Sequence, residues 1–460
     1  MPVAPDLSAL EDRTPRGIAG AFSRAIRSGE LSPGDRLPTV RDVAAELGVS
    51  PATVSAAWQA LRRTGLVVSR GRSGTFVKDT PTPWLSPRQR SLVGAGHDGL
   101  RLDLSRGTPD PMLLPDLEPA LHRVSQRAGT LAYQEEPVLP ALGAELARSW
   151  PYPAPALTVV DGATDGIARV LEQVVSYGDR VVLESPGFPP FFDLVEALGG
   201  EVVPVELDAV GVRPESLRRA LQTGPAAVVI QPRAQNPTGV SMTAGRAEQL
   251  ARAVRRRGKD APWVVEDDHS GWISTAPDVT LGTWVPDRVV HVRSYSKSHG
   301  PDLRIAALSG PSELVDRLVA RRMLGPAWTS RMLQTMLLDL ITASRSLDEV
   351  AEARRQYFAR QRTLVAALAE LGVEVAQPDG INLWLPVRDE RAAVLHLAAS
   401  GIRVAAGSAF LADPAADDGR GDHVRVTAGL VAPADAPEVA AALAAAARVS
   451  RGSEDVPVTP

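Results

Sequence analysis

The stretch SYSKSHGPDLR, residues 294–304, decides how the rest of the chain is interpreted. It lies between two apolar runs, Val289 to Val292 and Ile305 to Leu308, so it is predicted to be a loop between buried strands. A lone lysine on such a loop is usually a solvated charge. Lys297, however, has serines three and one positions before it, an arginine seven positions after it, and a Gly300-Pro301 turn between.

This arrangement indicates a particular chemistry for the lysine. A lysine that forms a Schiff base with an aldehyde cofactor needs neighbours that hold the cofactor's phosphate, and hydroxyl and guanidinium groups do so. The stretch resembles the lysine signature of fold-type I aminotransferases, which use pyridoxal 5'-phosphate (PLP). The resemblance implies that Lys297 forms the aldimine with PLP and that Ser294 and Arg304 bind its phosphate.

Length and composition set the broad class of the protein. A chain of 460 residues with 44% hydrophobic content is expected to hold two or more domains with ordinary cores. It contains no cysteine, which excludes disulfides and cysteine-ligated metals. No apolar run is as long as a membrane span, and Met1 to Arg13 lacks the apolar core of a signal peptide. We therefore expect a cytoplasmic protein, and no cluster of residues predicts a metal site.

Charge is distributed unevenly along the chain. Residues 13–78 contain eleven lysines and arginines against four acids, a net charge of +7, whereas the whole chain carries −4. The remainder is therefore acidic, at −11. A basic head on an acidic body indicates that the first part binds a polyanion.

The basic head has the pattern of three helices. Residues 16–29 carry apolar side chains at helical spacing. Thr39 is a candidate cap for a helix over 40–47, and Ser50 for a helix over 51–64. A helix, a short turn and a second helix form the helix-turn-helix plan, in which the last helix of the domain reads DNA.

A two-stranded wing is predicted to follow these helices. Residues 66–70 and 74–77 alternate like strands on either side of the turn Gly71-Arg72-Ser73. Together the run resembles the winged helix-turn-helix of GntR-type bacterial regulators, through LSPGDRLPTVRDVAAELGVSPATVSAAWQALRRTGLV (residues 31–67) and SGTFV (residues 73–77).

The resemblance to GntR-type regulators implies a set of DNA contacts. Thr39, Arg41, Ser50 and Thr53 are expected to bind phosphates and bases of double-stranded operator DNA, and Arg72 to enter the minor groove. The chain departs from the family at Pro51, where a basic residue is common. Solvated helix-face charges are the alternative interpretation for each arginine taken singly.

The rest of the chain is predicted to be a linker and an α/β body. Residues 79–100 are rich in Pro, Ser, Gly and charge and lack periodicity, so they are predicted to be a linker between a DNA-binding domain, 13–78, and a second domain, 101–450. In the second domain apolar strands alternate with helical patterns, which argues for a parallel sheet with crossover helices.

Three stretches of the body supply further parts of a PLP site. Gly162-Ala163-Thr164 stands between a strand and a helix, so its N–H groups, including those of Ala163 and Thr164, are placed to meet a phosphate. Phe188 matches the aromatic that stacks on the cofactor ring in the resembled family, and Asn236, in the turn Asn236-Pro237-Thr238-Gly239, matches the partner of the cofactor's phenolic oxygen.

Asp267 and His269 follow an apolar strand, at the end where ligands of α/β proteins bind. Asp267 is the candidate partner of the pyridine nitrogen, which it keeps protonated. Strand alternation puts Asp267 and His269 on one face and Asp268 on the other. The family usually has tyrosine where this chain has His269, and a histidine that replaces it is expected to titrate near neutrality.

Two more residues are assigned by the resemblance. Tyr133 corresponds to a tyrosine that reaches the cofactor phosphate across a dimer interface, although Val138 and Gly143 depart from the pattern that follows it. Arg425 stands in a strand where aminotransferases bind a substrate carboxylate. A surface ion pair is the alternative role of Arg425.

The full order of parts resembles the MocR subfamily of GntR-type regulators, which fuse a winged helix-turn-helix to a fold-type I aminotransferase-like domain. This resemblance implies a homodimeric, PLP-dependent transcriptional regulator, not primarily an enzyme, that senses an amino compound or PLP through the aldimine on Lys297. An active aminotransferase with a tethered DNA-binding domain is an alternative hypothesis. A regulator whose body binds no cofactor is another.

Overall fold

The computed structural model describes residues 12–28, 30–78, 85–93, 100–127, 135–414 and 421–450, together with Leu7 and Leu10. The chain divides into two compact units. The first comprises residues 1–86 with the short segments 175–179 and 193–201, and the second comprises the remaining residues.

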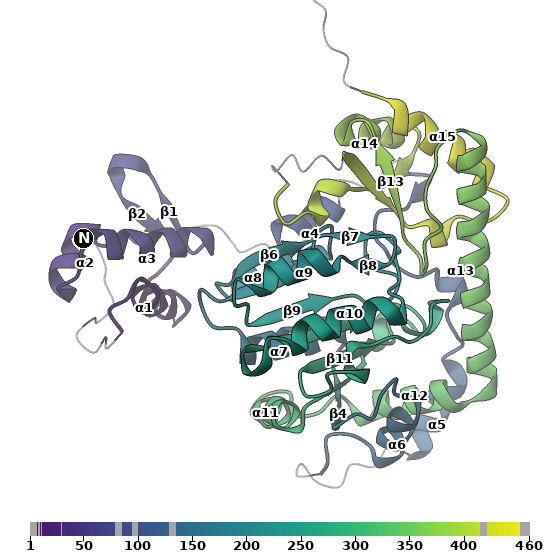
Figure 1. The fold of residues 1–460 in the computed structure, drawn as a ribbon, viewed down its shortest axis with the longest axis horizontal. Helices are drawn as coiled ribbons and strands as arrows, with labels where there is room; N and C mark the ends of the chain where they lie inside the picture. Colours follow the sequence, from purple (N-terminus) through teal and green to yellow (C-terminus); the bar gives the residue numbers. More distant parts are fainter. Residues whose placement is uncertain are drawn as a thin grey trace, which may run out of the picture. The chain divides into compact units, whose positions relative to one another are not determined.

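Three helices and a hairpin form the N-terminal part of the first unit (Figure 1). Thr39 and Ser50 cap the second and third helices as predicted, because their hydroxyl oxygens accept hydrogen bonds from the backbone N–H groups of Asp42 and Thr53, each at 3.2 Å. The elements are α1 (Pro15–Ser28), α2 (Val40–Leu47), α3 (Pro51–Arg63), β1 (Val67–Ser69), the 3-10 turn η1 (Gly71–Ser73) and β2 (Thr75–Val77).

The helical spacing noted in the sequence forms the core of this part. Phe22 of α1 is fully buried, and its ring packs edge-on against Trp58 of α3 with 4.6 Å between the ring centroids. Strands β1 and β2 pair antiparallel, with Val67 opposite Val77, and both of these valines face the same core. The predicted winged-helix architecture is therefore confirmed.

A seven-stranded sheet is the centre of the second unit (Figure 1). The strand order is β4-β12-β11-β10-β9-β5-β6. The bounds are β4 (Ala156–Val160), β5 (Arg180–Glu184), β6 (Glu201–Val205), β9 (Ala227–Ile230), β10 (Trp263–Asp268), β11 (Val289–Ser294) and β12 (Ala306–Gly310).

The predicted parallel sheet is correct for its centre and wrong for one strand. Strands β5, β9, β10 and β11 run parallel, but β12 runs antiparallel to both of its neighbours, β11 and β4. The cause is the connection: the loop over residues 295–305 is too short for a crossover to a parallel strand, which takes a dozen residues or more. The loop that carries Lys297 is therefore a return loop at one edge of the sheet.

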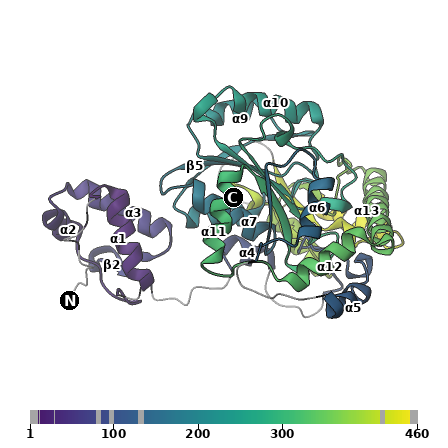
Figure 2. The ribbon, with the colours of Figure 1, turned by 90° about the horizontal axis from the view of Figure 1, so that it is seen from below.

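Helices cover both faces of this sheet (Figure 2). On one face α9 and α10 pack buried leucines and valines against the valines of β5, β9 and β10. Helix α7 packs against β10, β11 and β12. The helices around the sheet are α5 (Glu118–Arg127), α6 (Pro140–Ser149), α7 (Ala163–Val174), α8 (Pro189–Ala197), α9 (Pro214–Leu221), α10 (Ala244–Arg255), α11 (Ser312–Met323) and α12 (Arg331–Thr342).

A smaller sheet follows the long helix α13, which runs from α12 to the last helix (Figure 1). Its order is β13-β16-β15, and a separate parallel pair joins β14 to β3 from the start of the body. The bounds are β3 (Leu102–Asp103), β7 (Leu207–Asp208), β8 (Gly211–Val212), α13 (Ser344–Glu370), β13 (Leu383–Val387), α14 (Glu390–Ala399), β14 (Ile402–Arg403), β15 (Ala405–Ala406), β16 (Asp422–Val426) and α15 (Ala436–Arg448).

The segment predicted as a linker contains a short helix, α4 (Pro87–Val93). Its Leu92 packs against the buried residues Ala405, Ala409 and Phe410 of the body, so this apolar contact helps to anchor the helix. Residues 79–84 and 94–99 lie outside the described residues. Among the helices that the structure describes, none is long and apolar enough to cross a membrane.

The core of the first unit gives a test of its packing. We expect Phe22→Ala to cost about 3–5 kcal/mol in that unit, because it empties a fully buried ring position beside Trp58. Hydrogen exchange of the α1–α3 amides, with calorimetry, measures this. Phe358→Ala is the matched control, since Phe358 is 39% exposed; equal exchange in both variants would contradict the packing described.

Candidate functional site

The candidate site lies at the carboxyl ends of β5, β9 and β10 and in the loop after β11. This is the edge of a parallel sheet where ligands of α/β proteins bind. Asn236 follows β9, Asp267 is the next-to-last residue of β10, and Lys297 follows β11. A fourth part, Arg425, comes from β16 of the smaller sheet. The four lie in one neighbourhood, because the charge of Lys297 is influenced by both Arg425 and Asp267, and Arg425 contacts Asn236.

Lys297 stands in a turn, and its Nζ donates a hydrogen bond to the carbonyl oxygen of Gly107 at 2.5 Å. Burial, together with the positive charge of Arg425, lowers the pKa of Lys297 to about 8, and Asp267 opposes the shift. A pKa near 8 leaves a useful fraction of the amine neutral at physiological pH. The neutral amine is the form that attacks a carbonyl carbon.

Asp267 has one satisfied and one unsatisfied oxygen. Its Oδ2 accepts a hydrogen bond from Gln231 Nε2 at 2.7 Å, whereas its Oδ1 is buried without a partner among the described residues. Burial raises the pKa of Asp267 to about 7, and the nearby Lys297 acts in the opposite direction. A buried carboxylate oxygen without a donor is costly, so the site has an unfilled place for a group that donates an N–H.

His269 is a neutral histidine in this structure. Burial, followed by the charge of Lys297, lowers its pKa to about 4. The expectation from sequence that it titrates near neutrality is therefore wrong, because the buried position disfavours the imidazolium ion. Its Nδ1 is buried and finds no partner in the part of the chain that the structure describes, and its Nε2 lies 3.2 Å from the hydroxyl of Ser270.

Arg425 is a buried cation that no carboxylate of the described residues neutralises. Only 2% of the residue is exposed, and it donates to Asn236 Oδ1 at 3.3 Å and to the carbonyl oxygen of Ser105. Its guanidinium carbon lies 4.9 Å from the centre of the Phe410 ring. Burial lowers the pKa of Arg425 to about 10, which still leaves it charged at neutral pH. The alternative role, a surface ion pair, does not fit this burial.

A second cationic position lies at the start of α7. Arg304 donates to the carbonyl oxygen of Asp161 at 3.2 Å and lies against Gly162. Gly162 has a φ of 103°, and a Cβ there would stand only 2.8 Å from an Arg304 nitrogen, so only glycine lets the guanidinium approach. Ala163 and Thr164 open α7 here, and the N–H groups of a helix start attract anions.

Of the other residues predicted for the PLP site, the structure describes Ser294 and Phe188 but not Tyr133. Ser294 is the buried last residue of β11, and its Oγ accepts a hydrogen bond from Ser296 N at 3.2 Å. Phe188 is half-buried in the loop after β5. The backbone N–H of the preceding Gly187 donates to the carbonyl oxygen of Phe410. This loop is therefore held near Phe410, the residue whose ring lies under the Arg425 guanidinium. Tyr133 lies outside the described residues.

Three residues of the site were not predicted from the sequence. Gln231 orients Asp267, Gly107 accepts the bond from Lys297, and Phe410 underlies Arg425. Gln231 follows β9 directly, so its place at the carboxyl end of a predicted strand is a signal that was available. Gly107 and Phe410 have no local signal, since only the fold brings them to the site.

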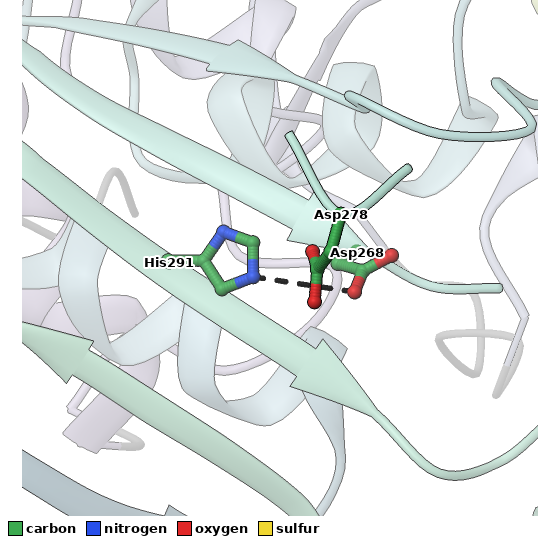
Figure 3. A group of neighbouring side chains, drawn as sticks. All are labelled: Asp268, Asp278 and His291. Atoms are coloured by element: carbon green, nitrogen blue, oxygen red, sulfur yellow. Dashed lines mark ion pairs between the residues drawn. The ribbon is translucent and has the colours of Figure 1, made fainter. Parts of the chain in front are cut away.

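The opposite face of β10 carries a separate charged cluster (Figure 3). Asp268, Asp278 and His291 bring side chains of metal-ligand type within 4.8 Å of one another. Both carboxylates already bind guanidinium groups, however: Arg233 lies 2.5 Å from Asp268, and Arg293 lies 2.8 Å from Asp278. Two cations in contact with the ligands disfavour a metal ion there. The cluster is an ion-pair network, with strand alternation as predicted.

The predicted DNA-contacting residues lie at the starts of α2 and α3. The hydroxyls of Thr39, Ser50 and Thr53 take part in helix capping, with 2.8 Å between the last two. Arg41 is exposed on α2, and no hydrogen bond or ion pair within the described residues engages it. Arg72 lies in η1 at the tip of the wing, but its side chain is outside the described residues.

Two protein families match the chain over almost all of its length. Residues 101–443 match the family Aminotransferase class I and II, and residues 15–77 match the family Bacterial regulatory proteins, gntR family. The fold agrees with the first match. The structure is similar to the α-aminoadipate aminotransferase LysN of Thermus thermophilus (TM-score 0.68, 20% identity, 78% of this chain and 94% of that one) and to a kynurenine aminotransferase of Pyrococcus horikoshii (0.66, 19%, 79% and 96%).

Relatives that carry both domains are also found. The vitamin B6 salvage pathway transcriptional repressor PtsJ of Salmonella typhimurium is 35% identical over 87% of this chain and 92% of its own length. The regulator TauR of Rhodobacter capsulatus is 27% identical (93% and 95%), and the probable rhizopine catabolism regulatory protein MocR of Rhizobium meliloti is 27% identical (74% and 74%).

The two family matches cover the N-terminal DNA-binding domain, called the reader below, and the body that follows it, in the order that the sequence predicted. The reader is a DNA-binding domain of helix-turn-helix type, and the body has the fold of enzymes that typically bind PLP. The chain therefore belongs to the MocR-type GntR family of transcriptional regulators, in which a helix-turn-helix DNA-binding domain is fused to an aminotransferase-like domain.

Proposed function

We propose that this regulator carries PLP covalently on Lys297 and that an amino compound, or PLP itself, controls its binding to operator DNA. The observation that carries this proposal is the pairing of a half-buried lysine of lowered pKa with a buried carboxylate whose Oδ1 has no partner among the described residues. Asp267 would hold the pyridinium N–H of PLP, which is the kind of donor that its Oδ1 lacks, and Lys297 would hold the aldehyde carbon.

The other residues fit the remaining groups of PLP. Arg304, Ser294 and the N–H groups of Ala163 and Thr164 would hold the phosphate, with Tyr133 contributed by the partner of a homodimer. Asn236 and His269 would face the phenolic oxygen, and the unpaired Nδ1 of the neutral His269 is able to donate to it or accept from it. Phe188 would stack on the ring.

When bound, PLP supplies an electrophilic carbon that exchanges one amine for another. Arg425 would bind the carboxylate of an incoming amino compound, because it is a buried cation without an acidic partner. Asn236 accepts a hydrogen bond from Arg425 and would also contact PLP, so it would link binding of the carboxylate to the cofactor. A ligand that binds two states of the body unequally shifts the population of those states. This shift would change the spacing or mobility of the two DNA-binding domains of the dimer.

PLP itself is the second candidate for the signal. The name of the Salmonella relative assigns it to repression of vitamin B6 salvage. A regulator of that kind would respond to occupancy of the Lys297 site, without an amino compound. We therefore infer that repression of vitamin B6 salvage genes is a function to test first for this chain.

An active aminotransferase is a candidate from a different class. The presence of a lysine, a pyridine partner and a buried carboxylate-binding arginine favours it. Steady turnover of an amino acid with a keto acid would establish it, whereas a single half-reaction or none supports the regulator.

Lys297→Ala is expected to abolish the absorption band that borohydride fixes to the protein, because it removes the amine. The chain has only three lysines, Lys78, Lys259 and Lys297, so peptide mapping after reduction identifies the labelled residue without ambiguity. Lys259→Ala is the matched control and should keep the band. Label on a peptide containing Lys78 or Lys259 would overturn the assignment.

Arg41→Ala should weaken binding to a DNA site selected in vitro with the wild-type protein. Loss of a phosphate contact reduces the slope of log affinity against log salt by about 1, and loss of a base contact costs about 1–3 kcal/mol. Fluorescence anisotropy at several salt concentrations measures both. Arg255→Ala removes an exposed arginine of α10 and is the control; identical curves for the two variants would exclude Arg41 as a contact.

Arg425→Leu should leave PLP bound but weaken the response to an amino acid by about 1.5–3 kcal/mol, the usual worth of a charged hydrogen-bonded contact. The measurement is a titration of the cofactor's absorption with the amino acid. The amine that lacks the carboxylate serves as the internal control, since wild type and variant should respond to it alike. An unchanged response to the amino acid would rule out Arg425 as the carboxylate anchor.

A further inference from the structure

Glu184 is a buried carboxyl group to which the proposed function gives no role. It ends β5, one of the strands that converge on the site, and only 6% of the residue is exposed. A small cavity beside it is lined by apolar side chains, namely Phe188, Phe191, Phe192, Leu183 and Val229. An ionised carboxylate in such surroundings needs a cation or several hydrogen bonds to offset its burial.

Glu184 has few such partners. Its Oε2 accepts one side-chain hydrogen bond, from Gln235 Nε2 at 3.2 Å, and the backbone of Gln231 provides a further hydrogen bond to the carboxyl group. Among the described residues, no lysine, arginine or histidine forms an ion pair with it. Arg88 of α4 is engaged elsewhere: its guanidinium lies over the ring of Phe192 and donates to the carbonyl oxygen of Ala412. The acid that acts on Glu184 from β10 is Asp267.

One turn connects Glu184 to the cofactor side of the site. Gln235 donates to Glu184, and four residues earlier Gln231 donates to Asp267 Oδ2 at 2.7 Å. The side-chain oxygen of Gln231 accepts the backbone N–H of Asn236 at 2.8 Å. The turn over residues 231–236 is therefore fixed at both ends by a carboxyl group, and it carries Asn236, whose Oδ1 accepts a hydrogen bond from Arg425.

The two acids are not equivalent. Burial raises the pKa of Asp267 to about 7, but the charges of Lys297 and His291 favour its ionised form. Glu184 has neither, and burial raises its pKa to about 8, with the charge of Asp267 adding to the shift and hydrogen bonds from the Gln231 backbone and the Gln235 side chain opposing it. A second buried negative charge is most costly next to the first, so one of the pair keeps its proton.

We propose that Glu184 is a positioning residue that holds a proton at neutral pH, so that Asp267 alone carries the negative charge at the pyridine end of the site. As a neutral acid, Glu184 accepts from Gln235 and holds the 231–236 turn without competing with Asp267 for Lys297 or for a bound cation. The role toward the cofactor rests on the proposed function, whereas the protonation of Glu184 does not.

The first test needs no cofactor. In the unfolded chain a glutamate ionises near pH 4.3, whereas Glu184 in the folded chain keeps its proton up to about pH 8. Between these values the folded state holds one more proton, so stability falls as pH rises. Glu184→Gln removes this dependence. The folding equilibrium constant of the variant, divided by that of wild type, should rise about tenfold for each pH unit of increase across this window.

Two measurements record this effect. Melting temperatures from pH 5 to 8 should diverge between wild type and Glu184→Gln, while the exposed control Glu374→Gln should follow wild type. Infrared spectra of wild type with carboxyl-labelled glutamate should show a protonated carboxyl at pH 7, and this measurement stands even where the variant fails to fold. Parallel melting curves without that infrared band would overturn the proposal.

The positioning role needs the cofactor's spectrum. With PLP added, Glu184→Gln should keep the wild-type spectrum near neutral pH and lose an alkaline transition near pH 8 that wild type shows. Glu184→Leu, which cannot accept from Gln235, should bind PLP more weakly than the Gln variant. An identical alkaline transition in wild type and Glu184→Gln would refute the role. Failure of wild type to bind PLP would instead refute the proposed function, and the infrared result would still decide the proton on Glu184.

Discussion

The site depends on how the end of β10 divides two adjacent carboxylates between the faces of the sheet. Strand alternation sends Asp268 to one face, where Arg233 binds it at 2.5 Å and holds its pKa well below the usual range. It sends Asp267 to the other, where one oxygen binds Gln231 and the other is unpaired. Gln231 and Arg233 belong to one loop, so that loop is fixed from both faces at once. The place of Asn236, and through it of Arg425, follows from this anchoring.

What the sequence predicted well is what neighbouring residues determine. Thr39 and Ser50 cap helices because a hydroxyl reaches an N–H three residues on, and that relation is visible in the sequence. The same holds for the loop of Lys297, which is bounded by two apolar strands, and for Gly162, which stands between a strand and a helix as expected. The roles of these residues toward PLP and DNA remain predictions, since they concern molecules that the fold alone does not contain.

What the sequence could not predict arises from contacts between distant segments. Gly107 meets Lys297 across 190 positions, and Phe410 lies under Arg425 because β15 and β16 pair in the smaller sheet. The antiparallel β12 escaped because alternation of strands and helices gives the order of elements but not their direction. The low pKa of His269 escaped for a similar reason: the residue type sets the reference value, and burial, which only the fold reveals, sets the shift.

The balance of charge distinguishes the two faces of β10 and argues for the kind of ligand that belongs in the site. On the Asp268 face, Arg233 and Arg293 are matched by Asp268 and Asp278, so that face is complete without a ligand. On the other face, Arg425 is buried and Lys297 is half-buried, and the charge of Arg425 disfavours that of Lys297, while Asp267 is the acid that acts on Lys297. Arg304 adds a further cation at the start of α7.

A molecule that brings a phosphate at one end and a carboxylate near Arg425 would neutralise these cations, whereas a neutral ligand would leave Arg425 buried without a counter-charge. The excess of positive charge is therefore a reason, independent of any resemblance, to expect an anionic ligand on this face of the sheet.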